Sequence, residues 1–571
     1  MAHQGGGPPP HHQPGGIPPY QNHQRPAVFW GGSATQHLAA GMYLDPVFRR
    51  TALNQVVRRR YRELAPSYGF EPLPVLFHAR RAQQFDLLRD AVLVGIQLIL
   101  LCTLSTALVG VYGTLLSWYQ LVLVAQVLGA LVTVARTGVP LRTFRRVWAR
   151  ALGFSLFTLF VSVPLFVYSL SVSLNAAAPS DGQSTNPGSD RGGVLASLSG
   201  YSVGATVTML VLVTVCVAAG SVRQSALDRL AHSVDPSASA GQLDLAARIP
   251  RQIVTYAGVE PFLGSGAVGH EWSFTHRLVP DLAAGELRPE QTDRARLPFT
   301  TKDVVDYLRG RFIALRDSPL DGQRLPGFTI QDGIYLSDLY SYPVPDAPIP
   351  PYEHARIVNE AYEQVRHYLV LQVVGWRGEV VTTVYVRVSV QGGMLYLEFS
   401  ARELPPTKPE YRVIDTIGGV GVSGYIRMVW QDLRDVPTTV AFSAFRLLRT
   451  GLDAAGGVLA RNAAAGQAQL AARRFGPAVS IRQEGSALPP YHYFQEADFE
   501  RFTKVVERRL LADLIVYLRD QGVDVAEFRQ RAGTILNYGV QHFGVGDITV
   551  EQSAVGQGNQ VNSGGRDAGK R

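Results

Sequence analysis

The residues with the spacing to do chemistry include two sets of glycines that follow the GxGxxG pattern of dinucleotide-binding loops. In the first set, Gly264, Gly266 and Gly269 are followed at once by His270–Phe274, whose alternation predicts a strand. A dinucleotide loop must instead lead into a helix, because the helix N-terminus receives the pyrophosphate. We therefore interpret the first set as a flexible turn before a strand.

The second set, Gly419, Gly421 and Gly424, follows an expected strand at Tyr411–Ile417 and precedes an expected helix at Tyr425–Leu433. That order is the one a dinucleotide loop requires, so these glycines are the candidate cofactor-binding residues. The pattern lacks an acidic residue for a ribose at the end of a second strand, and a glycine turn explains it as well. We therefore expect no cofactor.

Histidines show no metal-ligand spacing. His270 and His276 share one face of the expected strand but stand roughly 20 Å apart at ~3.3 Å per residue, too far to bind one ion. The aromatic residues Tyr256, Trp272 and Phe274 are expected in the core rather than in a ligand cage. The sequence contains no HExxH, Walker A or GxSxG motif, so we predict no metal site and no catalytic residue.

The elements that would position a site divide between membrane and soluble parts. Of 571 residues, 46% are hydrophobic, and the mean hydropathy is +0.05. These values are modest for a protein with several membrane spans, so most of the chain must lie outside the bilayer. Two cysteines occur, Cys102 and Cys216, both within apolar runs, which excludes a disulfide framework in the soluble part.

The stretch Ala91–Ala135 contains no Asp, Glu, Lys or Arg. A spanning helix needs roughly 20 apolar residues, so this stretch fits two helices joined by a turn near Gly110–Thr114. A third span is expected at Ala151–Leu174, and a fourth ends near Ala219. We therefore predict an integral membrane protein with four transmembrane helices and a cytoplasmic α+β domain with an antiparallel β-hairpin.

Arginines outside the apolar runs predict the topology. The loop 136–150 has no acidic residue and contains Arg136, Arg142, Arg145, Arg146 and Arg150. Positive residues mark the cytoplasmic side, so this loop and both termini are expected in the cytoplasm of a bacterial plasma membrane. The loop 175–193 then faces outward. The spans contain no ionisable residue of the kind that couples transport, which argues against a transporter.

The N-terminal part is expected to hold a tail and two helices. Residues 1–43 are rich in Gly, Pro, His and Gln and are expected to be disordered. Within 44–90, a basic amphipathic helix begins at Asp45 and ends at Pro66. Its polar face includes Arg58, Arg59 and Arg60. This helix either lies on anionic lipid headgroups or packs on the soluble domain, and a second helix near Ala79–Asp90 runs into the first span.

From 221 to 536 the composition is that of a cytoplasmic α+β domain. Strands are expected at Gln252–Tyr256, Glu271–Thr275, His367–Val374 and Val380–Val390, the last turning at Gln391–Gly393 into a partner strand through Ala401. Helices are expected at Thr300–Leu315 with a capping box, at Tyr352 to about Arg366, and at Asp498–Asp520 before Gly522.

Two motifs flank the predicted spans. The first is Ala65–Phe70, with the sequence APSYGF, and the second runs from Tyr256 to Gly266 and is followed by Trp272. Both resemble uncharacterised multi-pass membrane proteins of high-GC bacteria. The resemblance implies an architecture and no activity, so it assigns no catalytic residue.

The C-terminal segment 537–571 contains short apolar pairs separated by Gly, Asn and Gln, which indicate brief strands like the rungs of a solenoid. We hypothesise that this segment supports homo-oligomerisation through Ile548, Val550 and Val555. The alternative is a disordered tail.

These observations favour a membrane-anchored scaffold or sensor whose cytoplasmic domain binds a protein partner or a ligand. Two alternatives stay open: an enzyme with an unrecognised active site in the cytoplasmic domain, and a transporter or channel component. A concave pocket with several titratable groups would favour the enzyme, and a polar cavity at mid-membrane would favour transport. No nucleic-acid partner is expected.

Overall fold

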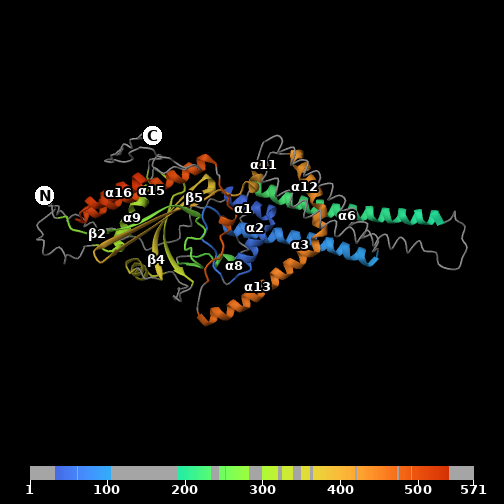
Figure 1. Cartoon of the computed structure of the whole chain (residues 1–571), viewed down its shortest axis with the longest axis horizontal. Helices are drawn as coiled ribbons and strands as arrows, with labels where there is room; N and C mark the ends of the chain where they lie inside the picture. The colour runs from blue at the N-terminus through green and yellow to red at the C-terminus, as the bar shows by residue number, and fades with distance from the viewer. Residues whose placement is uncertain are drawn as a thin grey trace, which may run out of the picture.

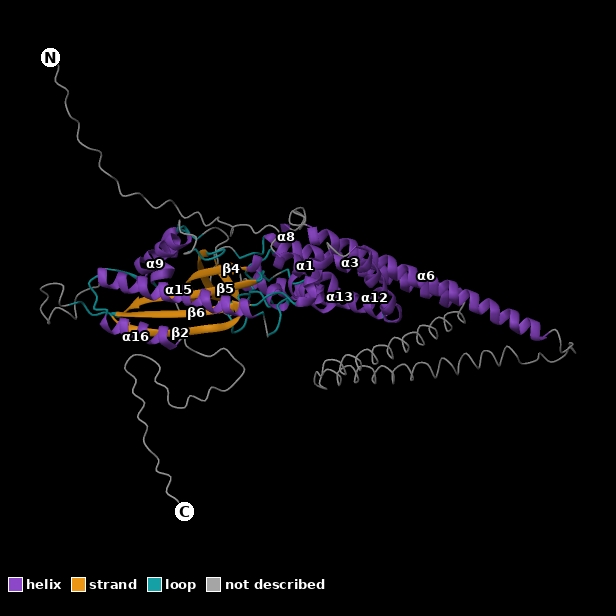
Figure 2. Cartoon of the chain, turned by 90° about the horizontal axis from the view of Figure 1, so that it is seen from above, coloured by secondary structure: helices purple, strands orange, loops and turns teal. Residues whose placement is uncertain are grey.

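The computed structural model describes residues 33–60, 62–103, 190–232, 243–250, 253–281, 299–318, 324–338, 349–360, 364–417, 421–471, 475–489 and 492–538. Figure 1 shows a sheet domain at one end and a helical bundle beside it. Helices α3 (Pro72–Thr103) and α6 (Asp190–His232) reach out of the bundle, away from the sheet. Seen from above, both leave the bundle in the same direction (Figure 2).

Within the described residues, six strands form one sheet in the order β1-β3-β4-β5-β6-β2. The strands are β1 (Ile253–Tyr256), β2 (Ala267–Arg277), β3 (Thr329–Ser337), β4 (Val365–Gly375), β5 (Val380–Gln391) and β6 (Met394–Leu404). The pair β1–β3 is parallel, and the other neighbouring pairs are antiparallel. The strands expected between 252 and 401 are confirmed, but the sheet is mixed because β1 runs parallel to β3.

The β5–β6 hairpin has the predicted pairing. Val386 pairs with Phe399, and Gln391 pairs with Met394, which leaves Gly392 and Gly393 as a two-residue turn. Both glycines have positive φ, 59° and 73°, as the commonest two-residue hairpin turn requires. The turn is therefore defined by a local signal.

Both faces of the central strands are covered. On one face, α9 (Thr301–Arg316) and α15 (Tyr493–Asp520) pack over the side that carries Val386. On the other face, the ring of Phe262 stacks on Tyr385 with 3.9 Å between ring centroids. Tyr385 and Tyr368 on this face are therefore buried as well, in an aromatic cluster with Phe262.

Two helices of the sheet domain have the caps that the sequence predicts. Thr300 and Asp303 form the predicted capping box, and α15 ends before Gly522, whose φ is +72°. Helix α10 (Pro351–Asn359) ends well before the predicted Arg366, because that residue already belongs to β4. Further helices of this domain are η5 (Trp376–Gly378) and α16 (Ala526–Tyr538), whereas Ile481 of α14 (Ile481–Glu484) packs in the hydrophobic core of the bundle.

The bundle is built from separate parts of the chain. Besides α3 and α6 it contains α1 (Ser33–Leu44), α2 (Pro46–Thr51), the π-helix η1 (Ala52–Val57), α8 (Leu243–Ala246), η6 (Pro409–Val413), α11 (Ile414–Ile417), α12 (Gly421–Ala441) and α13 (Ser443–Ala471). Leu38, Leu76 and Leu227 lie in its core. Helices α12 and α13, which lie within the predicted α+β domain 221–536, pack on α6 and α3, so this part of the stretch belongs to the bundle.

Helix α1 occupies part of a segment that the sequence predicted to be disordered. Leu38 and Met42 are fully buried where α1 packs against α3 and η6. The composition of 1–43 conceals this helix because the glycines and prolines gather before Ser33. The expectation of disorder for 1–32 lies outside the described residues.

The basic helix that begins at Asp45 packs inside the protein. Leu53 and Val56 are buried in the bundle core, so the helix lies in the bundle rather than on the sheet domain. It ends as the π-helix η1 and does not reach Pro66. Arg49 is buried, so the arginines of this helix are not all in water.

Among the described residues, one helix is long and apolar enough to cross a membrane, the Val207–His232 part of α6. Helix α3 continues without a break into the predicted first span as far as Thr103, as expected. Because α6 begins at Asp190, the end of the predicted exterior loop is helical. The stretch 104–189, which contains the predicted second and third spans and the arginine loop, lies outside the described residues, and the four-span topology stays a prediction.

Candidate functional site

The sheet domain meets the bundle where the two sequence motifs come together. Gly264, with a φ of +101°, approaches the Pro66 carbonyl so closely that a Cβ would lie 3.0 Å from the oxygen. The Gly264 N–H donates to Gln483 Oε1 at 3.0 Å, and Tyr68 shares a hydrogen bond between hydroxyls with Tyr385 at 2.8 Å. The two motifs are thus packed together at the junction. Gly264 and Gly266 precede the strand as expected, whereas Gly269 lies within β2 at an irregularity of its pairing.

The turn between β4 and β5 lies at the centre of this junction. Trp376 and Arg377 have positive φ, 50° and 55°, a region that costs a non-glycine residue of order 1–3 kcal/mol. Gly378 follows with a φ of +91°, and a Cβ there would overlap the Gly69 carbonyl. The Trp376 indole donates to the Asp498 carboxylate at 2.8 Å. The backbone is therefore strained where the two bodies of the protein, the sheet domain and the bundle, touch. Contacts from both hold it in place.

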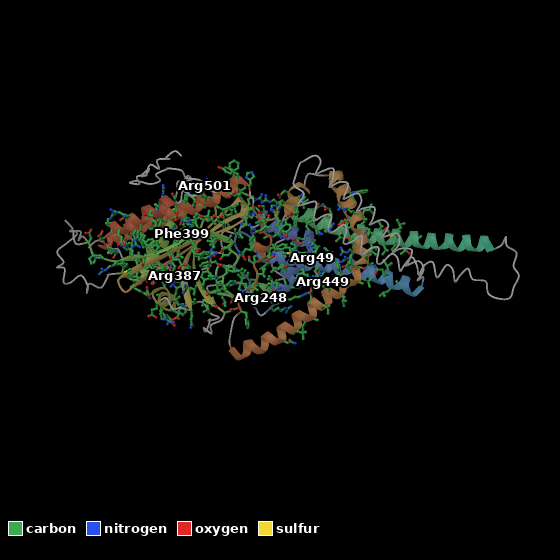
Figure 3. All side chains as sticks on the ribbon, in the orientation of Figure 1. Arg49, Arg248, Arg387, Phe399, Arg449 and Arg501 are labelled. Carbon is green, nitrogen blue, oxygen red and sulfur yellow. The ribbon has the colours of Figure 1, made fainter. Side chains whose placement is uncertain are left out.

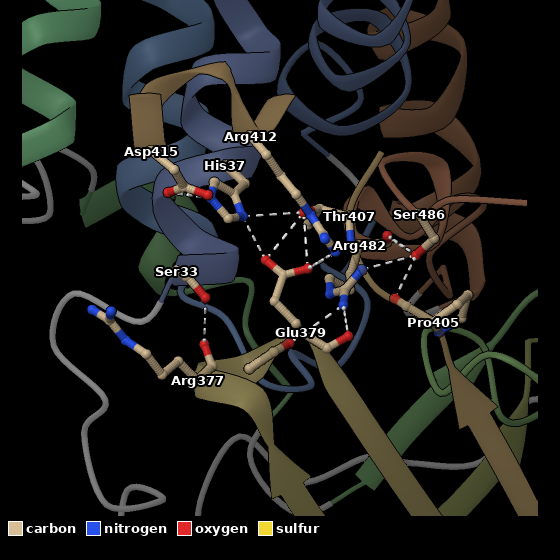
Figure 4. A network of polar contacts seen from close by, with 11 residues as sticks. Ser33, His37, Arg377, Glu379, Pro405, Thr407, Arg412, Asp415, Arg482 and Ser486 are labelled. Atoms are coloured by element: carbon tan, nitrogen blue, oxygen red, sulfur yellow. Dashed lines mark hydrogen bonds and ion pairs between the residues drawn. The ribbon is translucent and has the colours of Figure 1, made fainter. Parts of the chain in front are cut away.

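Glu379 follows this turn and is a buried carboxylate at which three segments converge (Figure 4). Its Oε1 is 2.6 Å from Nδ1 of His37, which stands on α1. Its Oε2 accepts from the Thr407 N–H at 2.7 Å and from the Thr407 hydroxyl at 2.9 Å. Arg412 of η6 places Nη2 3.4 Å from the same oxygen. One carboxylate thus joins the sheet to the bundle.

The junction holds a buried ion pair. Burial by itself raises the pKa of Glu379, but the hydrogen bond from His37 and the charge of Arg482 lower this pKa by more, to about 2. Burial by itself lowers the pKa of His37, and the bonds to Glu379 and Asp415 outweigh it, so the pKa is raised. His37 Nε2 lies 3.0 Å from Asp415 Oδ1. Both ring nitrogens face carboxylates, as a protonated imidazole requires.

Arg482 of α14 also stabilises the strained turn between β4 and β5, through hydrogen bonds to its backbone. Its side chain is fully buried, and Nη2 donates to the carbonyls of Gly378 at 3.3 Å and Glu379 at 3.0 Å (Figure 4). Nη1 donates to Ser486 Oγ at 2.8 Å. Burial lowers the pKa of Arg482 to about 10, so the guanidinium stays charged at neutral pH. A buried guanidinium needs acceptors, and this one takes them from the turn.

The arrangement at Glu379 joins elements instead of presenting a reactive group. Both carboxylate oxygens and both ring nitrogens of His37 are engaged by protein groups. A general acid or base needs an atom within hydrogen-bond reach of a substrate, and this pair offers none. We therefore interpret the Glu379 network, here called the joint, as the rigid connection between the two bodies.

A cavity of about 510 Å³ lies in the bundle between α2, η1, α3 and α13. Its charged lining consists of Arg49, Arg50, Arg446, Arg449, Asp86, Asp90 and Asp453. Figure 3 shows Arg49 and Arg449 among the bundle helices and Phe399 in the sheet domain. The volume is that of a small-molecule site, and the one surplus positive charge favours an anionic ligand.

Two ion pairs connect the helices around this cavity. Arg50 of α2 is bidentate to Asp453 of α13, at 2.7 and 2.8 Å. Arg446 of α13 binds both carboxylate oxygens of Asp90 on α3, each at 2.8 Å. A ligand that competes for either arginine therefore acts directly on the contact between two helices.

A further polar cluster joins Asp332 of β3, His354 of α10 and His367 of β4, whose ligand atoms lie within 4.8 Å of one another. Two imidazoles and a carboxylate are a ligand set of zinc and non-haem iron sites. Asp332 Oδ1, however, lies 2.7 Å from Arg309 Nη2 and 2.8 Å from His367 Nε2. The guanidinium already supplies positive charge there, so the arrangement is an ion-paired cluster. Its members come from three elements, which explains why the sequence shows no ligand spacing.

The candidate dinucleotide loop is not supported by its surroundings. The expected strand Tyr411–Ile417 was wrong, because η6 and α11 occupy it. Gly421 and Gly424 lie at the start of α12, and Gly419 lies outside the described residues. A helix therefore precedes the glycines where a dinucleotide fold needs a strand.

The remaining predicted site residues are placed in part. Arg58 donates to Asn54 Oδ1 at 2.5 Å and lies against Gly457 of α13, while Arg59 and Arg60 follow the end of η1. Contact of these arginines with lipid headgroups stays a prediction. The residues outside the described part are Arg136, Arg142, Arg145, Arg146, Arg150, Ile548, Val550 and Val555.

Residues 271–551 match the family model of the AbeC-like domain. Comparisons with curated proteins and with solved structures gave no match. The matched segment begins within β2 and contains Glu379, Arg412 and Arg482, whereas His37 precedes it. The part of the chain that carries the carboxylate side of the joint is therefore similar to the AbeC-like domain.

Proposed function

We propose that this protein is a membrane-anchored sensor in which the sheet domain, presented in the cytoplasm to a protein partner, is coupled to the membrane helices. The proposal rests on the joint at Glu379. His37 stands on α1, which packs against α3, and α3 leads into the predicted first span. A displacement of the membrane helices therefore reaches the sheet through direct bonds instead of a flexible linker.

Membrane anchoring is supported by the far ends of α3 and α6. Leu98, Ile99, Val207 and Leu210 are exposed apolar residues there. Exposed apolar surface on helices long enough to span is typical of a lipid-facing segment. On this proposal the protein lies in a plasma membrane with both termini in the cytoplasm, because the predicted loop 136–150 is rich in arginine.

A chain of contacts leads from the cavity to the joint. Arg50 lines the cavity from α2. Asp45 caps that helix and accepts a hydrogen bond from the Tyr411 hydroxyl at 2.9 Å. Arg412, the next residue of η6, reaches Glu379. An anionic ligand that binds Arg50 would therefore displace α2. The displacement would pass through η6 to the hydrogen bonds of the joint.

The cavity favours a sensor over an enzyme. It is concave and gathers titratable groups, but it lies in the bundle and its arginines and aspartates pair with one another. Such a lining supports binding of a charged ligand more directly than acid–base catalysis. The transporter alternative requires a polar cavity at mid-membrane. Because the predicted second and third spans lie outside the described residues, this alternative stays open.

Hydrogen exchange of the full chain in lipid nanodiscs tests the coupling. Asp453→Asn removes one charge from the cavity lining and should change the exchange rates of the β5 amides beside Glu379. In a Tyr411→Phe background, which removes the bond to Asp45, that change should disappear. Unchanged exchange in β5 on Asp453→Asn would contradict the proposed coupling.

The matched control is Asp317→Asn, which removes an exposed carboxylate of the sheet domain that pairs with its neighbour Arg316. It should leave β5 exchange unchanged in either background. Anchoring is tested separately, by carbonate extraction of cell membranes and by a reporter fused to the C-terminus. The chain should remain in the membrane pellet, and activity of an exterior-only reporter would contradict the topology.

A further inference from the structure

The connection between α12 and α13 carries large apolar side chains that the protein leaves uncovered. Phe445 is 57% exposed and Leu448 is 63% exposed, and Phe442 and Trp430 are exposed as well. On a helix these spacings place Phe445, Leu448 and Leu452 on one side. A soluble surface rarely gathers such residues. The segment 436–448, flanked by Trp430 and Leu452 and here called the elbow, therefore presents an apolar surface that requires a partner.

The inner side of the elbow packs on the predicted membrane spans themselves. Val436 and Val440 form one buried cluster with Leu93 of α3 and with Leu212 and Cys216 of α6. The elbow is therefore attached beside the helices that leave the bundle.

The contacts of the elbow with α3 and with α6 place it at the same distance from the predicted cytoplasmic ends of the spans. Gln97 Nε2 donates to the Val440 carbonyl at 2.9 Å, and Gln97 lies six residues beyond Ala91, where the predicted first span begins, or ~9 Å at ~1.5 Å per residue. Leu212 lies seven residues before Ala219, where the predicted fourth span ends, or ~10 Å by the same rise.

Two ion pairs near the elbow agree with such a depth. Arg446 is bonded to both oxygens of Asp90 and to the Thr439 carbonyl, so its guanidinium faces protein groups. Arg223 pairs with Asp432, one helical turn before Val436. Charged groups inside a bilayer are expected to pair in this way, and unpaired ones to stay at the headgroup level.

We infer that the elbow dips into the cytoplasmic leaflet and that its occupant is the acyl region of the lipid bilayer. The α12–α13 segment then enters and leaves the membrane on the same side without crossing it, as a monotopic element does. This inference rests on the proposed membrane anchoring and adds a membrane contact inside the segment that matches the AbeC-like domain.

Fluorescence quenching in nanodiscs tests the inference on the full chain. Cys102→Ala and Cys216→Ala remove the native thiols, and Phe445→Cys carries an NBD label. Leu210→Cys on α6 reports on the predicted span, and Val259→Cys, exposed in the sheet domain, reports on water. Doxyl-labelled lipids should quench the labels at positions 445 and 210 several-fold more than the label at position 259.

The outcomes separate the two proposals. Quenching at position 210 together with none at position 445 would overturn the inserted elbow and leave membrane anchoring intact. Absence of quenching at both positions would overturn the anchoring itself. Leu448→Cys gives a second reading of the elbow should the Phe445 variant fail to elute as a single species, and the same two outcomes apply to it.

Discussion

The joint at Glu379 and the cavity at Arg50 use the same types of charged residue but differ in their access to water. At the joint, Glu379 is 5% exposed and its pKa falls to about 2. In the cavity, the side chain of Arg50 is 39% exposed and that of Asp453 is 20% exposed. Water and salt screen the second pair much more than the first. Similar chemistry thus gives a fixed connection in one place and an adjustable site in the other.

The comparison is tested most severely by Glu379→Gln. The variant leaves the charges of His37 and Arg482 without their buried partner, so the free energy of unfolding should fall by roughly 3–5 kcal/mol. Chemical denaturation of the detergent-solubilised protein measures this. Asp415→Asn removes the exposed partner of His37 and should cost less than about 1 kcal/mol. Equal costs would show that burial does not distinguish the two carboxylates.

Stability of the joint should depend on pH in two directions. The folded pKa of Glu379, about 2, lies below its ordinary 4.5, so its contribution is complete above pH 4.5 and is lost as pH falls towards 2, by roughly 3 kcal/mol in all. The pKa of His37 is raised above 6.5, so its contribution is complete below pH 6.5 and is lost as pH rises through the folded value.

Urea unfolding across this pH range measures both limbs. Stability from the joint should be greatest between pH 4.5 and 6.5. His37→Gln should flatten the alkaline limb, and an alkaline limb unchanged in this variant would assign it to another group.

Two glycines with similar backbone angles distinguish the cost of a positive φ from the cost of a steric overlap. Gly378 and Gly258 have φ of +91° and +84°, but a Cβ at 378 overlaps the Gly69 carbonyl and one at 258 meets open space. Gly258→Ala should cost about 1–2 kcal/mol for its conformation alone. Gly378→Ala should cost about 1–3 kcal/mol more, because the two bodies must separate. Thermal unfolding measures both, and similar costs would contradict the close approach at the joint.

The smallest effect is expected in the cavity. Asp453→Asn should change the free energy of unfolding by less than about 1 kcal/mol, because Arg50 remains hydrated. Added salt should reduce even this difference, whereas the cost of Glu379→Gln should persist in salt. Denaturation at low and high salt makes the measurement, and a cost for Asp453→Asn that salt leaves unchanged would place the pair in a buried setting.

Local patterns predicted the sheet domain well. The Gly392–Gly393 turn, the Thr300 capping box and the end of α15 before Gly522 each depend on residues close together in the sequence. Such signals survive in the fold because their physical cause is local. The predicted strand Tyr411–Ile417 failed, since tertiary packing of Tyr411 in the bundle core holds that segment as helix.

The residues of the joint form no local pattern in the sequence. His37 and Glu379 are 342 residues apart in sequence, and Glu379 and Arg482 are 103 apart. Each residue alone is ordinary, and only the fold brings them together. The cavity was missed for the same reason, because Arg50 and Asp453 are separated by 403 residues. The elbow was missed because α12 and α13 lie within a stretch whose overall composition is that of a soluble domain.

The chain crosses between the two bodies several times, and this fixes the order in which synthesis can complete them. Strands β5 and β6 leave the ribosome early, but α15, which covers their apolar face, follows only after η6, α12 and α13 have joined the bundle. Until α15 and α16 arrive, α9 covers this face of the sheet without them, and the partly exposed apolar surface is prone to aggregation. A chain that stops before Tyr493 should be a substrate for chaperones and proteases rather than a shorter functional protein.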